Sequence, residues 1–139
     1  MGCGWGGGSH EAELRACLED KPWHHLLGWQ DPATPWYSVM DALALPSIEP
    51  DTFGRVCLEA QACATPVLGA AMGGIPESFA ADRSGLLLPA GAGRDWRDAI
   101  LRLAADVPLR ERLAGAGPDY ARRFDADVIA RDFLASLAR

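Results

Sequence analysis

Residues 46–77 read PSIEPDTFGRVCLEAQACATPVLGAAMGGIPE, and this stretch decides the fold of the chain. The apolar run at residues 43–45 leads into it and stops at Pro46, as a buried strand does. Residues 47–52 are polar and contain a further proline, which is typical of a loop. We therefore predict a strand at residues 43–45, followed by an acidic loop at residues 47–52.

A helix is expected to open at residues 53–54 and to stop before Pro66, because proline cannot continue a helix. Its apolar residues recur at helical spacing: Val56, Ala60 and Cys63. Residues 67–69 predict the next buried strand, and residues 73–74 are a Gly-Gly pair that predicts a turn. The order strand, loop, helix, strand and turn is that of an α/β protein.

This order has a chemical consequence. Loops at the carboxyl ends of parallel strands form the ligand crevice of an open α/β sheet. A helix N-terminus in that crevice presents free N–H groups and a partial positive charge, which suit a phosphate. Asp51 lies just before the expected helix and Glu59 lies inside it, and carboxylates accept hydrogen bonds from hydroxyls. Together these features suit a sugar nucleotide.

The same residues resemble the donor-binding signature of retaining glycosyltransferases of family 4, which have the two-domain B-type fold. Seven residues separate Asp51 from Glu59, as in that signature. The other pieces in register are a proline-serine strand end, Phe-Gly, Glu-Ala, Thr-Pro and Gly-Gly-x-Pro-Glu. There are two departures: Asp51 stands where the family usually has Glu, and Ala64 replaces a common glycine, which should affect packing more than chemistry.

The resemblance implies roles for individual residues. Asp51 would contact the donor sugar and Glu59 the ribose, and these two are the catalytic candidates. Backbone N–H groups near residues 53–55 would help to position sugar and phosphate. Gly74 and Glu77 are additional candidates, and Glu77 is equally well explained by the dipole of a short helix. The expected donor-binding set is Ser47, Asp51, Phe53, Gly54, Arg55, Val56 and Glu59.

The resemblance also implies that residues 1–139 form a single partial nucleotide-sugar-binding domain, the C-terminal portion of a transferase whose acceptor-binding domain is absent. The expected fold is a Rossmann-like parallel sheet of four strands with flanking helices, extra C-terminal helices and one exposed edge. Family members have an arginine and a lysine that neutralise the diphosphate, and Arg15 and Lys21 do not match them.

Composition narrows the functional classes. The 139 residues carry a net charge of −6, which gives no electrostatic support to non-specific nucleic-acid binding. The four cysteines have no metal-ligand spacing, and a buried position for Cys57 and Cys63 fits a reducing cytoplasm. The sequence has no membrane span and no signal peptide features. We therefore expect a cytoplasmic protein, with the cytosolic face of a membrane as the alternative for the full-length enzyme. The resemblance implies that it binds a nucleotide-sugar and needs no metal cofactor.

The N-terminal region is less informative. Gly2, Gly4 and Gly7 satisfy G-x-G-x-x-G, a pattern that indicates dinucleotide binding only after a strand, and no residues precede it to form one. The resemblance offers a Gly-x-Gly turn instead, and a disordered tip is the other interpretation. Ser9 is expected to cap a helix over residues 9–19, with these side chains toward a core: Ala12, Leu14, Cys17 and Leu18.

Residues 24–27 predict a short strand that ends at Gly28. His24 and His25 suggest a metal or catalytic pair, but adjacent strand residues point to opposite faces, so a structural role is favoured. A short helix is expected over residues 31–40.

Helical segments follow the central stretch. A short helix is expected at residues 75–80, a strand at 85–89 and a helix at 94–105. A helix from Pro108 is expected to end near Gly115, with a break at residues 117–118 before a short helix to Phe124. Asp125 would cap a final helix whose apolar stripe faces a core, formed by Ile129, Phe133 and Leu137.

Three functions fit these features. The first is a piece of an enzyme that transfers a sugar with retention from a nucleotide-sugar to an acceptor. The second is a non-catalytic nucleotide-binding module, which adding a separately made N-terminal half and assaying transfer would distinguish. The third is an isomerase such as a sugar-nucleotide epimerase, which the spacing Phe-Gly-Arg-Val-x-Leu-Glu-Ala disfavours.

Overall fold

The computed structural model describes residues 9–138, apart from the side chains of residues 9–11 and of Leu14. The glycine-rich opening with Gly2, Cys3, Gly4 and Gly7, and the expected capping side chain of Ser9, lie outside the described part. The chain divides into two compact units, residues 1–31 and residues 32–139. The assignment of residues 1–139 to one partial domain stays a prediction.

Within its described residues, the first unit contains the helix α1 (Ser9–Leu18), which confirms the helix expected at residues 9–19. The expectation that Ala12 and Cys17 face a core is wrong, because both side chains are exposed, while Leu18 is half-buried. The described residues that follow α1 in this unit form turns and irregular backbone. They provide no second regular element against which the helix could bury those side chains.

The strand expected at residues 24–27 is also wrong. A turn precedes it, in which the amide of His24 donates a hydrogen bond of 3.3 Å to the carbonyl of Lys21. Residues 24–30 then continue without regular structure, and Gly28 has a positive φ of 66°. An isolated apolar run cannot form a stable strand without a neighbour that accepts its backbone hydrogen bonds.

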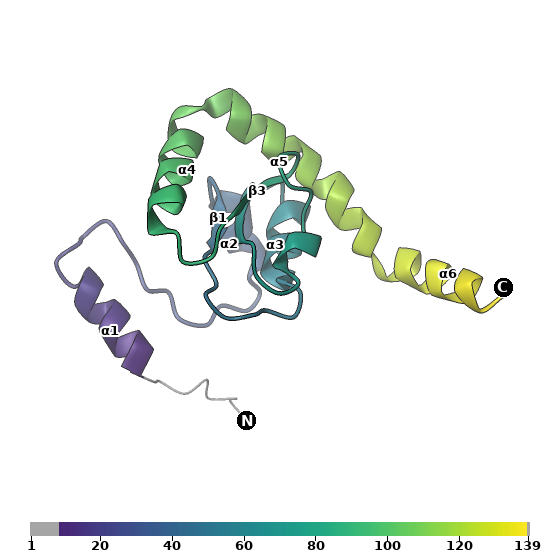
Figure 1. Cartoon of the computed structure of the whole chain (residues 1–139), viewed down its shortest axis with the longest axis horizontal. Coiled ribbons are helices and arrows are strands. Elements are labelled where there is room, and N and C mark those ends of the chain that lie inside the picture. Colours follow the sequence, from purple (N-terminus) through teal and green to yellow (C-terminus); the bar gives the residue numbers. More distant parts are fainter. Residues whose placement is uncertain (1–8, 139) are drawn as a thin grey trace. The chain divides into compact units, whose positions relative to one another are not determined.

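The second unit is built on a parallel sheet in the order β1-β2-β3 (Figure 1). The strands are β1 (Leu43–Leu45), β2 (Val67–Ala70) and β3 (Gly85–Leu88), all three at predicted positions. The central strand β2 is buried along its whole length, as a strand covered on both faces is expected to be. The described sheet therefore has three strands, not the four expected, because the run at residues 24–27 is not one of them.

The helices follow the predicted order. They are α2 (Thr34–Val39), α3 (Arg55–Ala62), the 3₁₀ turn η1 (Ile75–Glu77), α4 (Gly93–Ala105), α5 (Val107–Ala121), the 3₁₀ turn η2 (Arg122–Phe124) and α6 (Ala126–Leu137). The core that joins them to the sheet includes Leu68, Ile75, Phe79, Trp96 and Leu113. The buried face of α3 consists of Cys57, Ala60 and Gln61, so the expected stripe of Val56, Ala60 and Cys63 is shifted. Of the cysteines that the structure describes, Cys57 is fully buried and Cys63 is half-buried.

The break expected at residues 117–118 is wrong, because α5 continues through both of them. Proline disfavours a helical conformation in the preceding residue by clashing with its backbone N–H and its Cβ, and Gly117 lacks the Cβ. The same glycine lets α5 approach α3 closely, since a Cβ on Gly117 would lie 3.0 Å from the carbonyl oxygen of Gln61. Close packing against α3 therefore compensates for the hydrogen bond that Pro118 cannot donate.

The last helix differs from the prediction in its surroundings. Asp125 occupies the position before α6 but makes no capping bond through its side chain. Ile129, Phe133 and Leu137 are exposed, so the expectation that they face a core is wrong. Figure 1 shows α6 continuing beyond α5, away from the sheet that its apolar stripe would have to reach.

No helix among the described residues is both long enough and apolar enough to cross a bilayer.

Candidate functional site

Two loops meet at the carboxyl ends of β1 and β2. The amide of Gly74, after β2, donates a hydrogen bond of 2.8 Å to the carbonyl of Asp51, after β1. A Cβ on Gly73 would lie 2.3 Å from that oxygen, and a Cβ on Gly74 would lie 2.2 Å from the carbonyl oxygen of Thr52. The predicted Gly-Gly turn is thus required for direct backbone contact with the acidic loop, and we call this contact the loop clasp.

The carboxylate of Asp51 folds back onto its own loop. Its Oδ1 accepts hydrogen bonds from the amides of Phe53 at 2.9 Å and of Gly54 at 2.8 Å. These two bonds hold the pKa of Asp51 below its ordinary value, because they stabilise the ionised form. Two of the three amides expected to position sugar and phosphate, those of Phe53 and Gly54, therefore already have an acceptor. The described residues make no hydrogen bond to the second oxygen, Oδ2, which keeps its acceptor positions.

The start of α3 is fixed from several directions. Gly54 precedes the helix with φ 74°, in the left-handed region that favours glycine. The ring of Phe53 packs on the ring of Phe124, with 5.3 Å between the ring centroids. The ring of Phe124 packs in turn on that of Tyr120, with 5.6 Å between the centroids. The hydroxyl of Tyr120 donates a hydrogen bond of 2.9 Å to the carbonyl of Glu77. Residues from α5 and η2 thereby brace both site loops, a role that sequence reasoning missed.

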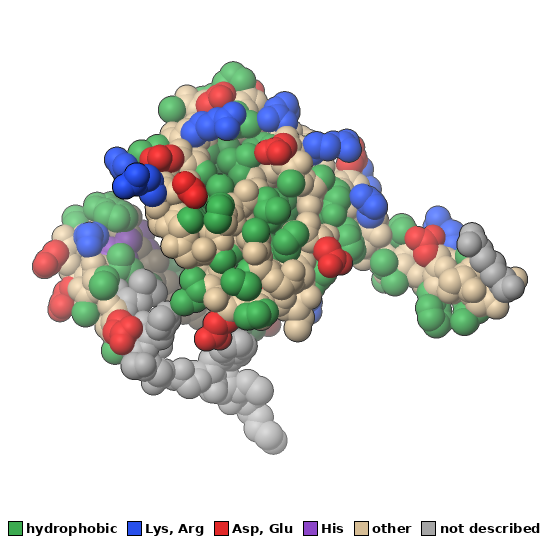
Figure 2. Space-filling view, viewed as in Figure 1, with side chains coloured by type: hydrophobic (Ala, Val, Ile, Leu, Met, Phe, Trp, Pro, Cys, Tyr) green, Lys and Arg blue, Asp and Glu red, His purple; other side chains and the backbone are tan. Residues whose placement is uncertain are grey.

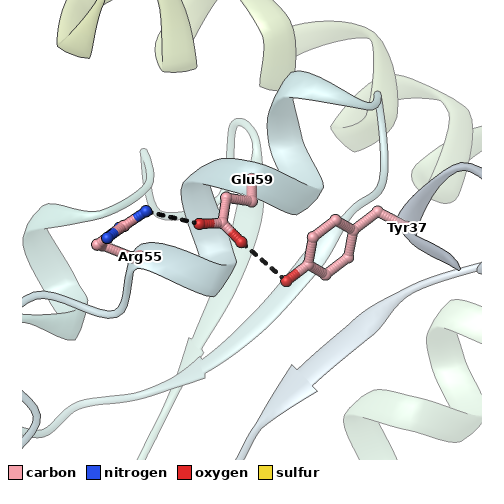
Figure 3. A network of polar contacts seen from close by, with 3 residues as sticks. All are labelled: Tyr37, Arg55 and Glu59. Carbon is pink, nitrogen blue, oxygen red and sulfur yellow. Dashed lines mark hydrogen bonds and ion pairs between the residues drawn. The ribbon is translucent and has the colours of Figure 1, made fainter. Parts of the chain in front are cut away.

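Glu59 lies one turn further along α3. Its Oε2 accepts a hydrogen bond of 3.0 Å from the hydroxyl of Tyr37, and its Oε1 lies 3.2 Å from Nη2 of Arg55 (Figure 3). Burial, followed by the hydrogen bond to Glu59 and its negative charge, raises the pKa of Tyr37 to about 12. Sequence reasoning also missed Tyr37, since it lies 22 positions away from Glu59 in the sequence.

The other predicted site residues are Ser47, Val56, Glu77 and Gly74. Ser47 is half-buried in the loop after β1, and Val56 is exposed on α3. Glu77 is exposed in η1, a single 3₁₀ turn where a helix over residues 75–80 was expected. Gly74 acts through the loop clasp. The structure thus brings Asp51, Phe53, Gly54 and Gly74 together, while the ligand roles of all these residues stay predictions.

Of the hollows on the surface of the second unit, one lies beside a predicted site residue. An open hollow of about 300 Å³ lies beside Glu59, lined also by Leu58, Ala62, Pro118, Arg122 and Phe124. A larger hollow of about 540 Å³ beside β1 and α4 contains none of the predicted site residues. Figure 2 shows apolar and charged side chains interspersed over the visible face. Within the described residues no group of three His, Cys, Asp or Glu side chains could hold a metal ion, including His24 and His25.

The described fold is an α/β arrangement in which the two site loops meet at the carboxyl ends of the parallel strands β1 and β2, where ligands of open α/β sheets bind. Residues 3–106 match the family described as Glycosyl transferases group 1, and the chain belongs to this family. The narrower assignment to family 4 stays a prediction.

The chain is similar to curated enzymes named D-inositol 3-phosphate glycosyltransferase. The protein of Actinosynnema mirum is 44% identical over 100 residues, which cover 72% of this chain and 24% of that protein. The protein of Stackebrandtia nassauensis is 42% identical over 100 residues, covering 72% of this chain and 22% of that protein. The chain therefore spans about a quarter of the length of these relatives.

Solved structures confirm the predicted fold. HepE of Anabaena in complex with UDP matches with a TM-score of 0.80 and 27% identity, covering 93% of this chain and 35% of that one. Its complex with UDP-glucose matches with a TM-score of 0.81 and 25% identity, with 93% and 36% covered. The C-terminal domain of LpcC from Francisella tularensis matches in fold with a TM-score of 0.68 at 24% identity, with 83% and 62% covered. The chain has the Rossmann-like arrangement of B-type glycosyltransferases.

Proposed function

We propose that this chain is the donor-binding portion of a retaining glycosyltransferase, acting on an acceptor held by a domain outside the chain. The observation that carries the proposal is the loop clasp. It presents Asp51 beside the start of α3, with Glu59 one turn further along the same helix. Membership of the glycosyltransferase family supports the reaction class.

Each acid has a distinct role in this proposal. Glu59 accepts hydrogen bonds from the ribose hydroxyls of the nucleotide, because its carboxylate is part-exposed and retains acceptor positions beyond its two protein partners. Asp51 uses Oδ1 to hold the loop and Oδ2 to reach the donor sugar. Since Asp is one methylene shorter than Glu, either the sugar sits closer to this residue or a water bridges the two. The start of α3, which includes the residue Arg55, supplies positive potential for the phosphates.

The comparisons suggest which ligands to test first. Uridine nucleotides are the first donors, since HepE was solved with UDP and with UDP-glucose. D-inositol 3-phosphate is the first acceptor to supply to a whole enzyme, since it appears in the names of the curated relatives. We further propose that the reaction takes place in the cytoplasm and needs no metal cofactor. A non-catalytic nucleotide-binding module would share the binding step but not the transfer.

Titration calorimetry of the chain with UDP, GDP and ADP tests the binding step. Glu59→Gln keeps the shape of the side chain and removes its charge, so it should weaken nucleotide binding roughly tenfold. Glu111→Gln, at an exposed position of α5, is the matched control and should bind like wild type. Equal affinities for wild type and Glu59→Gln, with equal melting temperatures, would contradict the role assigned to Glu59.

A further inference from the structure

Tyr37 lies outside α3 and holds one oxygen of Glu59, while Arg55 holds the other (Figure 3). An ionised carboxylate offers about four acceptor positions, and the two protein partners occupy two of them. Each oxygen can therefore still accept a hydroxyl from a ligand. Which direction those free positions face depends on the rotamer in which the side chain is held.

The two partners hold Glu59 with different firmness. The side chain of Arg55 is 84% exposed, and exposed ion pairs restrain their partners only weakly. Tyr37 is only 7% exposed, so its ring is already immobilised by packing. The hydrogen bond from Tyr37 consequently costs little additional side-chain entropy.

The backbone of Tyr37 is anchored as well. Its carbonyl accepts a hydrogen bond of 2.6 Å from Oγ1 of Thr65, a buried residue at the entrance to β2. Its amide donates a hydrogen bond of 3.3 Å to the carbonyl of Ala33. The Tyr37 hydroxyl is thus placed relative to β2, the strand whose carboxyl end carries the loop clasp.

The hydroxyl also remains a donor over the physiological pH range. Burial and the nearby Glu59 raise the pKa of Tyr37 to about 12, so the phenol does not ionise near neutral pH. The described residues offer Glu59 this hydrogen bond from a buried group and the ion pair from an exposed one. The former restrains the orientation of the carboxylate more firmly than the latter.

We propose that Tyr37 is a positioning residue that holds Glu59 in the rotamer that presents both carboxylate oxygens to a vicinal diol. The diol is that of a ribose, so the inference rests on the proposed function. It follows that preference for a ribonucleotide over the 2′-deoxyribonucleotide depends on the Tyr37 hydroxyl, although that hydroxyl does not touch the nucleotide.

The test compares the affinities of the chain for UDP and for 2′-deoxyuridine diphosphate by calorimetry. Tyr37→Phe removes only the hydroxyl, and Ser38→Ala is the matched control because its hydroxyl bonds the Thr34 carbonyl on the exposed side of α2. Wild type and Ser38→Ala should prefer UDP by about fivefold or more. Tyr37→Phe should lose this preference and keep its affinity for the deoxynucleotide. Equal weakening for both nucleotides would overturn the proposal by making Tyr37 a packing residue.

Crystal structures of wild type and Tyr37→Phe without nucleotide give a readout that does not depend on binding. Glu59 should leave its wild-type rotamer in the variant, and an unmoved Glu59 would overturn the proposal. If wild type shows no preference for UDP but Glu59 moves in Tyr37→Phe, the ribose-binding role of Glu59 fails. In that case the positioning of Glu59 by Tyr37 stands.

Discussion

The amide of Gly74 lies 2.8 Å from the carbonyl oxygen of Asp51, and this single bond ties the loop after β2 to the loop after β1. Both loops carry predicted ligand-binding residues. The geometry of the site therefore depends on Gly74, which lies neither in the loop that carries Asp51 nor in the helix that carries Glu59.

Substituting Gly74 by Ala should open the loop clasp. The added Cβ would lie 2.2 Å from the carbonyl oxygen of Thr52, so the backbone must shift. We expect a destabilisation of roughly 1–3 kcal/mol by denaturant unfolding, together with weaker nucleotide binding. Gly115→Ala in α5 is the control, because its added Cβ meets no atom within 4 Å beyond the adjacent residues and the backbone of its own helix, and the substitution should be neutral or stabilising. Wild-type stability and binding in Gly74→Ala would show that the clasp has no such role.

Asp51→Asn should separate the loop-holding role of this residue from its chemical role. Asn also accepts backbone hydrogen bonds, so the melting temperature at neutral pH should fall only slightly. In a whole enzyme, Asp51→Asn should strongly reduce transfer and Glu49→Gln should matter little. If Glu49→Gln abolishes transfer while Asp51→Asn does not, the residue that contacts the donor sugar is Glu49, and our assignment to Asp51 is wrong by two positions.

The lowered pKa of Asp51 adds a dependence of stability on pH. Because the folded-state pKa lies below the unfolded value of about 3.9, the stabilisation is present above that value and is lost as pH falls through the folded pKa. Asp51→Asn lacks this contribution, so the stability difference between wild type and variant should shrink in acid. Urea unfolding between pH 6 and pH 3 measures this. A difference that stays constant would mean that the two amide hydrogen bonds do not stabilise the ionised carboxylate.

Ala64→Gly should stabilise the chain. Ala64 follows α3 with φ 57°, and its amide and that of Thr65 donate to the carbonyls of Gln61 and Ala60, which closes the helix end. A residue with a Cβ is strained in this left-handed conformation, and glycine is not. Since Ala64 is exposed, glycine leaves no cavity, and we expect a gain of up to about 1 kcal/mol in thermal unfolding. A loss of stability would mean that the flexibility of glycine in the unfolded chain outweighs the strain.

Glu59→Gln should lower the pKa of Tyr37 from about 12 but leave it above its ordinary value of 10.0. Burial is the largest cause of the shift and remains, whereas the hydrogen bond to a charged group and its Coulomb repulsion of the phenolate are removed. Ultraviolet absorbance of tyrosinate reports the ionisation, with Tyr120→Phe as the background because the chain has two tyrosines. At pH 11 we expect more tyrosinate in the double variant Glu59→Gln/Tyr120→Phe than in Tyr120→Phe alone. Identical titration curves for the two proteins would mean that the Tyr37–Glu59 bond does not form.

The same raised pKa links stability to alkaline pH. Tyr37 contributes stability that is fully present below its unfolded pKa of about 10 and is lost as pH rises through its folded value. Tyr37→Phe has no such group, so its stability should decline less than that of wild type above pH 10. Urea unfolding at pH 8 and pH 11 measures the two declines, and equal declines would contradict the link.

The sheet could be predicted because its strands are short apolar runs bounded by proline or glycine. The run at residues 24–27 carries the same signal and fails, since strand formation needs a neighbour that local sequence does not specify. Helix α5 continues through Gly117 and Pro118 because it packs closely on α3, which is a tertiary effect. Local sequence patterns could not reveal the role of Tyr37, whose partner lies 22 positions away on another helix.

The central claim is that a nucleotide-sugar binds where the loops after β1 and β2 meet. Amide chemical shifts of the ¹⁵N-labelled chain during titration with UDP, UDP-glucose, GDP and ADP test it most directly. At least one of these ligands should shift the amides of residues 51–59 and 73–77 together, and Glu59→Gln should weaken that response. Shifts confined to other parts of the sheet or to α6, or none at millimolar ligand, would contradict the claim.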